Sequence, residues 1–283
     1  MFDAKIILNY HESPYTHKAL DFPQDEWLRF MRWVHRYSPY GPLWLILSIV
    51  PAFLGFGKFI LNLLMFKIFI GLFHLLNAYL VYKIVGKLKS ENQLFATAFY
   101  ALNPLFLIEG VANAHNDVVL TTFLLAAVYF SVFSKNALSI IFLLTGTLIK
   151  YIPILNLPFL IWHLFSKDKN IEKLILLNVI TLAIFTFIFS TFRISVPFVS
   201  SSGLQVQFQP WYLFWTIPYI ALLKNKALII VAIAVCFGAL MRYLPFLYYG
   251  NWSMPGVSTF MTLVVMIPLV AALIFSSKKL INK

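Results

Sequence analysis

Charged residues are scarce in this sequence. Only 11% of its 283 residues are Asp, Glu, Lys or Arg, whereas soluble domains carry roughly 25%. Hydrophobic residues make up 61% of the chain, and the mean hydropathy is +0.83. This shortage of charge excludes water as the solvent for most of the chain.

Cysteine is almost absent as well. Cys236 is the single cysteine and lies inside an apolar run, so the chain has no intrachain disulfide and no paired-cysteine zinc or redox motif. The net charge is +12, but the basic residues are scattered between apolar runs and do not line one face, as nucleic-acid binding requires. We therefore expect no nucleic-acid partner and predict no metal-ligand set.

Long apolar runs dominate what is present. Runs such as 59–84, 174–192, 227–249 and 254–275 are near or above the ~18 residues that indicate a membrane-spanning helix. The predicted fold class is therefore all-α, a polytopic transmembrane helical bundle of about nine spans. The spans are expected at 59–85, 92–108, 118–134, 137–149, 153–165, 174–192, 210–223, 227–248 and 254–276.

The distribution of lysine between the spans predicts the orientation. Lysine-bearing breaks occur at 83–91, 134–136, 166–173, 224–226 and 276–283, and they alternate with lysine-poor breaks at 109–117, 150–152, 193–210 and 248–255. Because cytoplasmic loops carry an excess of Lys and Arg, the first set should be cytoplasmic, together with the C-terminus. The second set should face the extracytoplasmic side of a multi-pass membrane protein.

The first 57 residues differ from the rest because they are rich in charge. We expect residues 1–57 to form an extracytoplasmic loop with surface helices, of which Trp27–His35 is the best candidate. The apolar stretch Pro42–Phe56 is too short to span and is predicted to be a juxtamembrane helix. Residues 58–283 are predicted to form the transmembrane bundle.

A polar cluster interrupts the apolar sequence between two predicted spans on the outer side. Polar groups at membrane depth are costly and usually functional. Alternatively, Asn116 or Asp117 caps a helix that begins at Val118, but a cap does not account for the rest of the cluster. Its members are Glu109, Asn113, His115, Asn116 and Asp117.

Three cations on the outer side or at membrane depth are candidate phosphate ligands. Lys150 stands alone at the outer end of a predicted span, where the positive-inside rule disfavours it, so it is suited to neutralise a phosphate. The alternative is a lysine that snorkels to the interface. Arg193 and Arg242 are secondary candidates, because the sequence places no other polar group around them.

A segment before residue 216 combines amides with aromatic rings. Gln205, Gln207 and Gln209 precede Trp211 and Tyr212. Amides bind sugar hydroxyls and aromatic rings stack on sugar faces. The membrane-interface belt of aromatic residues also accounts for Trp211 and Tyr212, but it does not account for the glutamines.

Four stretches of the chain together resemble the GT-C superfamily of glycosyltransferases. Within it they are similar to the bacterial polyprenol-phosphomannose-dependent mannosyltransferases. The stretches are Ser13-Pro14-Tyr15 with Tyr40-Gly41-Pro42-Leu43-Trp44, Asn113-Ala-His115-Asn116-Asp117, Lys150 with Pro153, and Gln209-Pro210-Trp211-Tyr212 with Trp215 and Pro218. Each motif is short, but their order and their shared outer side strengthen the combination.

The resemblance implies a helical bundle in the prokaryotic plasma membrane, with a cavity open to the outer face. It also implies transfer of a sugar, mannose in this group, from a polyprenyl-phosphate donor to a glycan or lipid acceptor. The configuration at the sugar carbon is expected to be inverted. Asp117 is then the catalytic base, His115 a second proton acceptor or phosphate donor, and Lys150, with Arg193, a ligand of the donor phosphate. The partners are the lipid-linked donor, the acceptor and membrane lipids; no cofactor beyond the donor is implied, and a divalent metal is left open. The residues expected to contact sugar or acceptor are Asn113, Asn116, Gln209, Trp211, Tyr212 and Tyr40.

One departure from the family pattern affects the expected base. These enzymes open with a transmembrane helix and an Asp-x-x-Arg-Tyr-like motif that this sequence lacks, and Asp3 resembles a position just after that motif. We therefore expect an N-terminally truncated member. Two alternatives stay open: a lipid-linked glycan transporter or flippase, although no convincing internal repeat is found, and an inactive fragment that acts as a scaffold.

Overall fold

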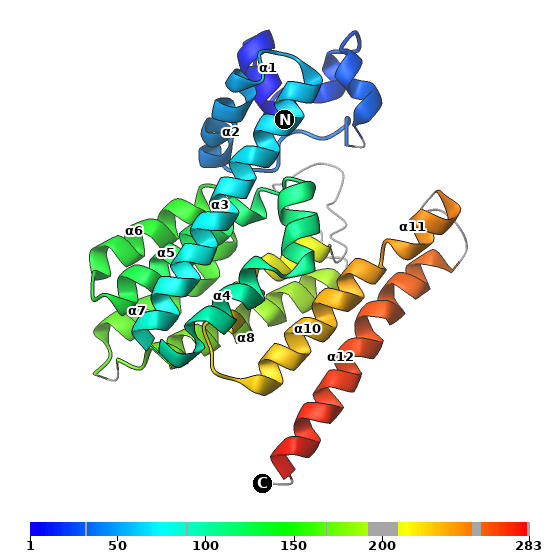
Figure 1. The fold of residues 1–283 in the computed structure, drawn as a ribbon. Helices are drawn as coiled ribbons and strands as arrows, with labels where there is room; N and C mark the ends of the chain where they lie inside the picture. Colours follow the sequence, from blue (N-terminus) through cyan, green and yellow to red (C-terminus); the bar gives the residue numbers. More distant parts are fainter. Residues whose placement is uncertain (32, 89, 168, 192–208, 251–255, 282–283) are drawn as a thin grey trace.

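The computed structural model describes residues 1–31, 33–88, 90–167, 169–191, 209–250 and 256–281, and these residues form helices and no strand (Figure 1). The α-helices are α1 (Phe2–Tyr10), α2 (Pro42–Leu54), α3 (Phe59–Leu88), α4 (Gln93–Ala101), α5 (Asp117–Val132), α6 (Asn136–Thr147), α7 (Leu157–Phe165), α8 (Ile171–Thr191), α9 (Ile217–Ala221), α10 (Lys226–Met241), α11 (Leu244–Tyr249) and α12 (Val257–Ile281). Between them lie the 3-10 helices η1 (Ala19–Asp21), η2 (Glu26–Phe30), η3 (Ser90–Asn92), η5 (Ile152–Asn156) and η6 (Pro210–Trp215), and the π-helix η4 (Phe106–Ala112).

Long apolar helices support a membrane protein. Within the described residues, two helical stretches are long and apolar enough to cross a bilayer, Phe59–Leu88 and Lys226–Tyr249, and a third is present if the bent pair α4 and η4 counts as one span. Each of the nine predicted spans contains a helix. Nine crossings and their orientation nevertheless stay a prediction. In Figure 1 the N-terminal helices α1 and α2 and the C-terminal end of α12 lie at opposite ends of the molecule.

The N-terminal segment differs in part from expectation. The short helix predicted over Pro42–Phe56 is found as α2, which begins with Pro42 in the first turn, where its missing N–H has no cost. Of the surface helix predicted over Trp27–His35, the structure has only a short 3-10 helix, η2, which ends at Phe30 because Met31 is extended. The Asp25 side chain caps η2 by accepting the Trp27 N–H at 2.8 Å.

Helix α1, whose position was not predicted, is held by two polar contacts with Asp25 and by an apolar cluster. Lys5 Nζ lies 2.5 Å from Asp25 Oδ2, and the Tyr10 hydroxyl donates to the same carboxylate at 2.6 Å. Phe2 and Ile6 are buried together with Trp27. The segment before α2 therefore contains short helices that share a buried apolar cluster. Its position outside the membrane stays a prediction.

A sharp break in the chain separates α4 from η4, and the two helices meet at 58°. The Asn103 side chain accepts the Leu105 N–H at 3.0 Å, next to Pro104, and a ring nitrogen of His74 lies 3.0 Å from the Ala101 carbonyl oxygen. These side chains satisfy backbone groups that the break would otherwise leave unpaired at membrane depth. The break carries the chain from α4 into the polar cluster that follows η4.

Helix α5 lies at the centre of the bundle. Most of its residues are buried, and it packs against α3 and α6. Asn77 of α3 donates to the Val118 carbonyl oxygen at 2.8 Å in the first turn of α5. The helix α12 packs on α10 at Gly238, where a Cβ would lie 2.3 Å from the Val264 carbonyl oxygen.

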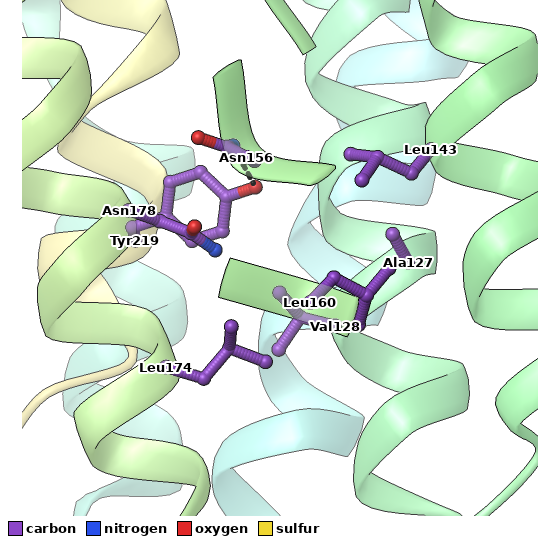
Figure 2. Close-up of a pocket in the computed structure, with 8 residues that line it drawn as sticks. All are labelled: Ala127, Val128, Leu143, Asn156, Leu160, Leu174, Asn178 and Tyr219. Carbon is purple, nitrogen blue, oxygen red and sulfur yellow. Dashed lines mark hydrogen bonds between the residues drawn. The ribbon is translucent and has the colours of Figure 1, made fainter. Parts of the chain in front are cut away.

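A small cavity of about 10 Å³ lies between α5, α6, α7, α8 and α9 (Figure 2). The Asn156 side chain donates to the Tyr219 hydroxyl at 3.2 Å, and Asn178 also faces the cavity. Polar side chains that pair inside a bundle hold helices together. None of the predicted site residues lines this cavity, so the catalytic chemistry is sought elsewhere.

Candidate active site

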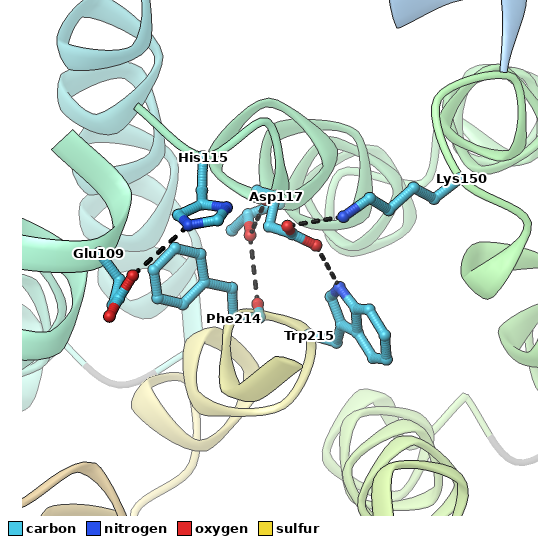
Figure 3. A network of polar contacts seen from close by, with 7 residues as sticks. Glu109, His115, Asp117, Lys150, Phe214 and Trp215 are labelled. Carbon is cyan, nitrogen blue, oxygen red and sulfur yellow. Dashed lines mark hydrogen bonds and ion pairs between the residues drawn. The ribbon is translucent and has the colours of Figure 1, made fainter. Parts of the chain in front are cut away.

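Asp117 is the centre of a buried polar network at the start of α5 (Figure 3). Its side chain is 0% exposed. Oδ2 lies 2.6 Å from Lys150 Nζ, and Oδ1 accepts the Trp215 indole N–H at 2.7 Å. Both carboxylate oxygens are therefore occupied, which is the condition under which a buried charge is tolerated.

Neither sequence alternative for this cluster and for Lys150 is found. Asn116 occupies the N-cap position of α5 but makes no capping side-chain hydrogen bond, and the Asp117 carboxylate bonds to distant side chains. Lys150 does not snorkel away, because its side chain is only 17% exposed and turns toward Asp117. The functional interpretation of Asp117 and Lys150 stays a prediction.

The position of Lys150 depends on a glycine in the Tyr40-Gly41-Pro42 motif. Gly41 N donates to the Ile149 carbonyl oxygen at 2.9 Å, and Leu43 N donates to the Leu148 carbonyl oxygen at 2.9 Å. A Cβ at Gly41 would lie 2.2 Å from that Leu148 oxygen, so a larger residue cannot approach this closely. The contact brings the segment before α2 against the chain that carries Lys150.

Helix η6 closes the other side of Asp117. The Thr121 hydroxyl lies 2.9 Å from the Asp117 carbonyl oxygen and 3.1 Å from the Phe214 carbonyl oxygen. This contact and the hydrogen bond from the Trp215 indole N–H to Asp117 hold η6 against the first turn of α5. The aromatic motif and the Asn-x-His-Asn-Asp motif therefore form one site.

Glu109 and His115 form a second pair beside the first. His115 Nε2 lies 3.4 Å from Glu109 Oε2, and the same oxygen accepts the Asn113 amide at 3.1 Å. Glu109 is 0% exposed and His115 is 25% exposed at the side chain. In Figure 3 the second ring nitrogen of His115 lies on the side away from Glu109.

The end of α10 completes the surroundings of Glu109. The Tyr243 hydroxyl hydrogen-bonds to the Glu109 carboxylate, and the Arg242 guanidinium interacts electrostatically with it. The expectation that no polar group lies near Arg242 is wrong, because residues far apart in sequence meet here. Arg242 is thereby explained as part of the Glu109 network.

Aromatic rings line the two pairs. The His115 ring stacks on Trp211 with centroids 4.1 Å apart, and Tyr212 stacks on Trp215 at 4.7 Å. Lys150 Nζ lies 5.5 Å from the centre of the Tyr40 ring. Three rings predicted to contact sugar or acceptor, Tyr40, Trp211 and Tyr212, are therefore next to the ionisable groups.

The remaining predicted site residues lie beside the two ion pairs or at the start of η6, or fall outside the described residues. Asn113 is exposed and bonded to Glu109, and Asn116 is buried beside Asp117. Gln209 is half-buried at the start of η6. Arg193, Gln205 and Gln207 lie outside the described residues. Within the residues that the structure describes, no group of three or more His, Cys, Asp or Glu side chains is arranged to hold a metal ion.

The sequence did not predict three features of these networks: the hydrogen bond from Trp215 to Asp117, the contact of Tyr243 with Glu109, and the pairing of Glu109 with His115. Glu109 carried a detectable signal, because it and Asp117 are the only carboxylates between residues 92 and 171 apart from Asp168. A buried indole N–H also needs an acceptor, which pointed to a partner for Trp215. Nothing in the sequence indicated Tyr243.

Comparison with known proteins gives one match. Residues 6–166, more than half of the chain, match the family model of the MptA_B family described as alpha-(1->6)-mannopyranosyltransferase, N-terminal domain. No curated protein and no solved structure matches the chain. The matched range contains both carboxylates, His115 and Lys150.

Proposed function

Because the chain belongs to the alpha-(1->6)-mannopyranosyltransferase family, we propose that it transfers mannose from a polyprenyl-phosphate donor to a hydroxyl of a glycan or lipid acceptor. The family name supports a C6 hydroxyl of mannose as the attacking group. The reaction takes place at the extracytoplasmic face, where the lysine-poor breaks are predicted to lie. The family also favours an enzyme over a transporter or flippase.

The observation that carries the proposal is the Lys150 ammonium, on a partly exposed side chain, held beside the fully buried Asp117 carboxylate. A cation held in place at the leaving group stabilises the charge that develops on a departing phosphate. Asp117 and the Tyr40 ring restrict the position of Nζ on two sides. Lys150 is therefore proposed to bind the donor phosphate, with Arg193 as a second candidate ligand.

The acceptor hydroxyl must lose a proton as it attacks. The family resemblance assigns that proton to Asp117, but both Asp117 oxygens are engaged and the side chain is fully buried. His115, the other predicted acceptor, has a partly exposed side chain. We assign it the proton, since a general base must reach the group it deprotonates.

The proposed step is a single displacement at the anomeric carbon. The acceptor O–H bond breaks and its proton passes to His115, while the acceptor oxygen forms a bond to C1 of the mannosyl group. The bond between C1 and the phosphate oxygen breaks, and its electron pair leaves with the polyprenyl phosphate beside Lys150. Attack from the opposite side inverts the configuration at C1.

The aromatic rings and amides supply sugar contacts in this proposal. Trp211, Tyr212 and Tyr40 surround the ionisable pairs, and aromatic faces offer apolar surface together with polar edges for a sugar. Asn113, Asn116 and Gln209 provide amide groups that pair with hydroxyls.

The test is mannosyl transfer by the purified chain in lipid nanodiscs, with radiolabelled polyprenyl-phosphomannose and a short mannose oligosaccharide. We expect label in the oligosaccharide, and a loss of incorporation in Lys150→Met. Lys224→Met serves as the matched control, because Lys224 pairs with Glu91 at an exposed site. Absence of transfer by a stably folded wild-type chain in the presence of both substrates would contradict the proposal.

A further inference from the structure

Glu109 is a fully buried carboxylate that the transfer step leaves without a role. Its side chain is 0% exposed, and it lies in the π-helix η4, a distortion that is frequent at functional sites. A buried charge is costly unless it is paired. Three side chains pair with its carboxylate: the Asn113 amide, the His115 imidazole and the Tyr243 hydroxyl.

We propose that Glu109 is a positioning residue that orients His115 for proton transfer in the mannosyl-transfer reaction. The Nε2–H of His115 donates a hydrogen bond to this carboxylate, which leaves the Nδ1 lone pair on the opposite side of the ring for the acceptor hydroxyl. This inference rests on the proposed function for its substrate. The orientation itself is a property of the free protein.

The exposed fractions separate the two roles. Glu109 is 0% exposed and His115 is 25% exposed, so the carboxylate cannot reach a substrate and acts only through the imidazole. The first pair has the same arrangement, with Asp117 buried behind the partly exposed Lys150. In both pairs a fully buried carboxylate contacts a basic group whose side chain is partly exposed.

The ring of His115 is held on its face as well as at its edge. Trp211 stacks on it with an interplanar angle of 23°, while Glu109 holds Nε2. Within the described residues, no hydrogen bond engages Nδ1. In carboxylate–imidazole catalysis, the imidazole is the base that activates the nucleophile, and the carboxylate orients the imidazole. Glu109 and His115 have this arrangement.

The charges around the imidazole make the carboxylate necessary. When His115 takes the acceptor proton, it becomes a cation. Two other cations belong to the same site: Arg242, which interacts electrostatically with Glu109, and Lys150, which is paired with Asp117. The Tyr243 hydroxyl and the Asn113 amide are neutral donors to Glu109. Within the part of the chain that the structure describes, Glu109 is the carboxylate paired with His115, so its negative charge is the counter-ion of the new imidazolium.

The tautomer of His115 is the direct readout. We would label the six histidines with ¹⁵N, identify the His115 signals by their loss in His115→Asn, and record the spectrum of the wild-type chain in nanodiscs. The expected wild-type state is Nε2–H with an unprotonated Nδ1. In Glu109→Leu, which removes the acceptor, a mixture of both tautomers is expected.

Rates provide the second readout. Glu109→Gln keeps the shape of the side chain and is expected to reduce kcat on the order of 10²-fold, with little change in KM for the donor. The double variant with His115→Asn should lose no more than His115→Asn alone, because the two residues act as a unit. Glu91→Gln, a change at an exposed ion pair, is the control with unchanged rate.

The outcomes distinguish this inference from the proposed function. A wild-type spectrum with the proton on Nδ1, or with both tautomers, overturns the inference even if Glu109→Leu fails to fold. An active wild type whose tautomer and kcat are unchanged in Glu109→Gln and Glu109→Leu overturns it while the transferase function stands. If the Nε2–H state is found and depends on Glu109 while no mannosyl transfer occurs, the orientation by Glu109 is supported and the transferase function fails.

Discussion

Lys150 Nζ lies 2.6 Å from Asp117 Oδ2, although 33 residues separate the two in the sequence. Lys150 follows α6, and Asp117 begins α5. The close approach of Gly41 to Leu148 fixes the chain just before Lys150. The pair therefore depends on three separate segments, all within the range that matches the mannosyltransferase family.

Replacing Lys150 by Met is expected to weaken use of the phosphate-bearing donor. The side chain keeps its length but loses the charge that the proposed phosphate site needs. KM for polyprenyl-phosphomannose should rise by at least tenfold, while KM for the oligosaccharide acceptor changes little. Initial rates over a range of donor concentrations measure both. An unchanged donor KM would remove Lys150 from the phosphate site.

Replacing Asp117 by Asn should have nearly the same kinetic effect as removing Lys150. The neutral amide leaves the Lys150 ammonium without its counter-ion, and breaking an ion pair whose carboxylate is fully buried costs about 3–5 kcal/mol. Thermal unfolding in detergent should show a lower midpoint for Asp117→Asn. The double variant Asp117→Asn/Lys150→Met should recover part of this loss.

Kinetics of the same variant decide between two roles of Asp117. If it is the counter-ion of Lys150, the double variant is no slower than the worse single variant. If instead kcat falls about 10⁴-fold in Asp117→Asn while donor KM stays constant, then Asp117 itself accepts the proton, as the family resemblance implies.

The predicted orientation places the site outside the cell. In a Cys236→Ser background, a cysteine at the exposed position Asn113 should react with a membrane-impermeant maleimide in intact cells. A cysteine at Lys169, which is exposed near the opposite lysine-bearing break, should react only after lysis. The Cys236→Ser chain alone is the unlabelled control. Labelling of the cysteine at position 169 in intact cells would contradict the predicted topology.

The N-terminal segment should become unstable in acid. Burial raises the pKa of the Asp25 carboxyl, but hydrogen bonds from Lys5, Tyr10 and the Trp27 N–H outweigh burial and leave the pKa below its ordinary value. A carboxyl with a lowered folded-state pKa stabilises the fold at pH values above its unfolded pKa of about 3.9. This contribution is lost as the pH falls through the folded pKa.

Pepsin digestion at stepped pH values below 5 measures this change. Cleavage between Tyr10 and Trp27 should accelerate as the pH falls in the wild type. Asp25→Asn should be cleaved readily over the whole range, because the neutral amide cannot pair with Lys5. Glu26→Gln, whose side chain is 85% exposed in a loose pair with Arg29, should behave as the wild type.

Much of the fold follows from local sequence pattern. Long apolar runs predict helices because the bilayer leaves backbone groups no partner other than the helix itself, and each predicted span does contain a helix. Local pattern was less reliable at the N-terminus. There the contact of Lys5 with Asp25 and the capping of η2 decide the structure, and neither is visible from periodicity.

The sequence by itself determined the helical class and singled out the polar cluster around His115 and Asp117, and Lys150, as candidate site residues, because charged groups in an apolar chain are conspicuous and costly. It did not determine their partners. Only the tertiary structure joined Lys150 and Trp215 to Asp117, and Tyr243 and Arg242 to Glu109. Pairing of this kind depends on where helices cross and break, and a buried charge selects whichever partner the packed bundle brings within hydrogen-bond distance.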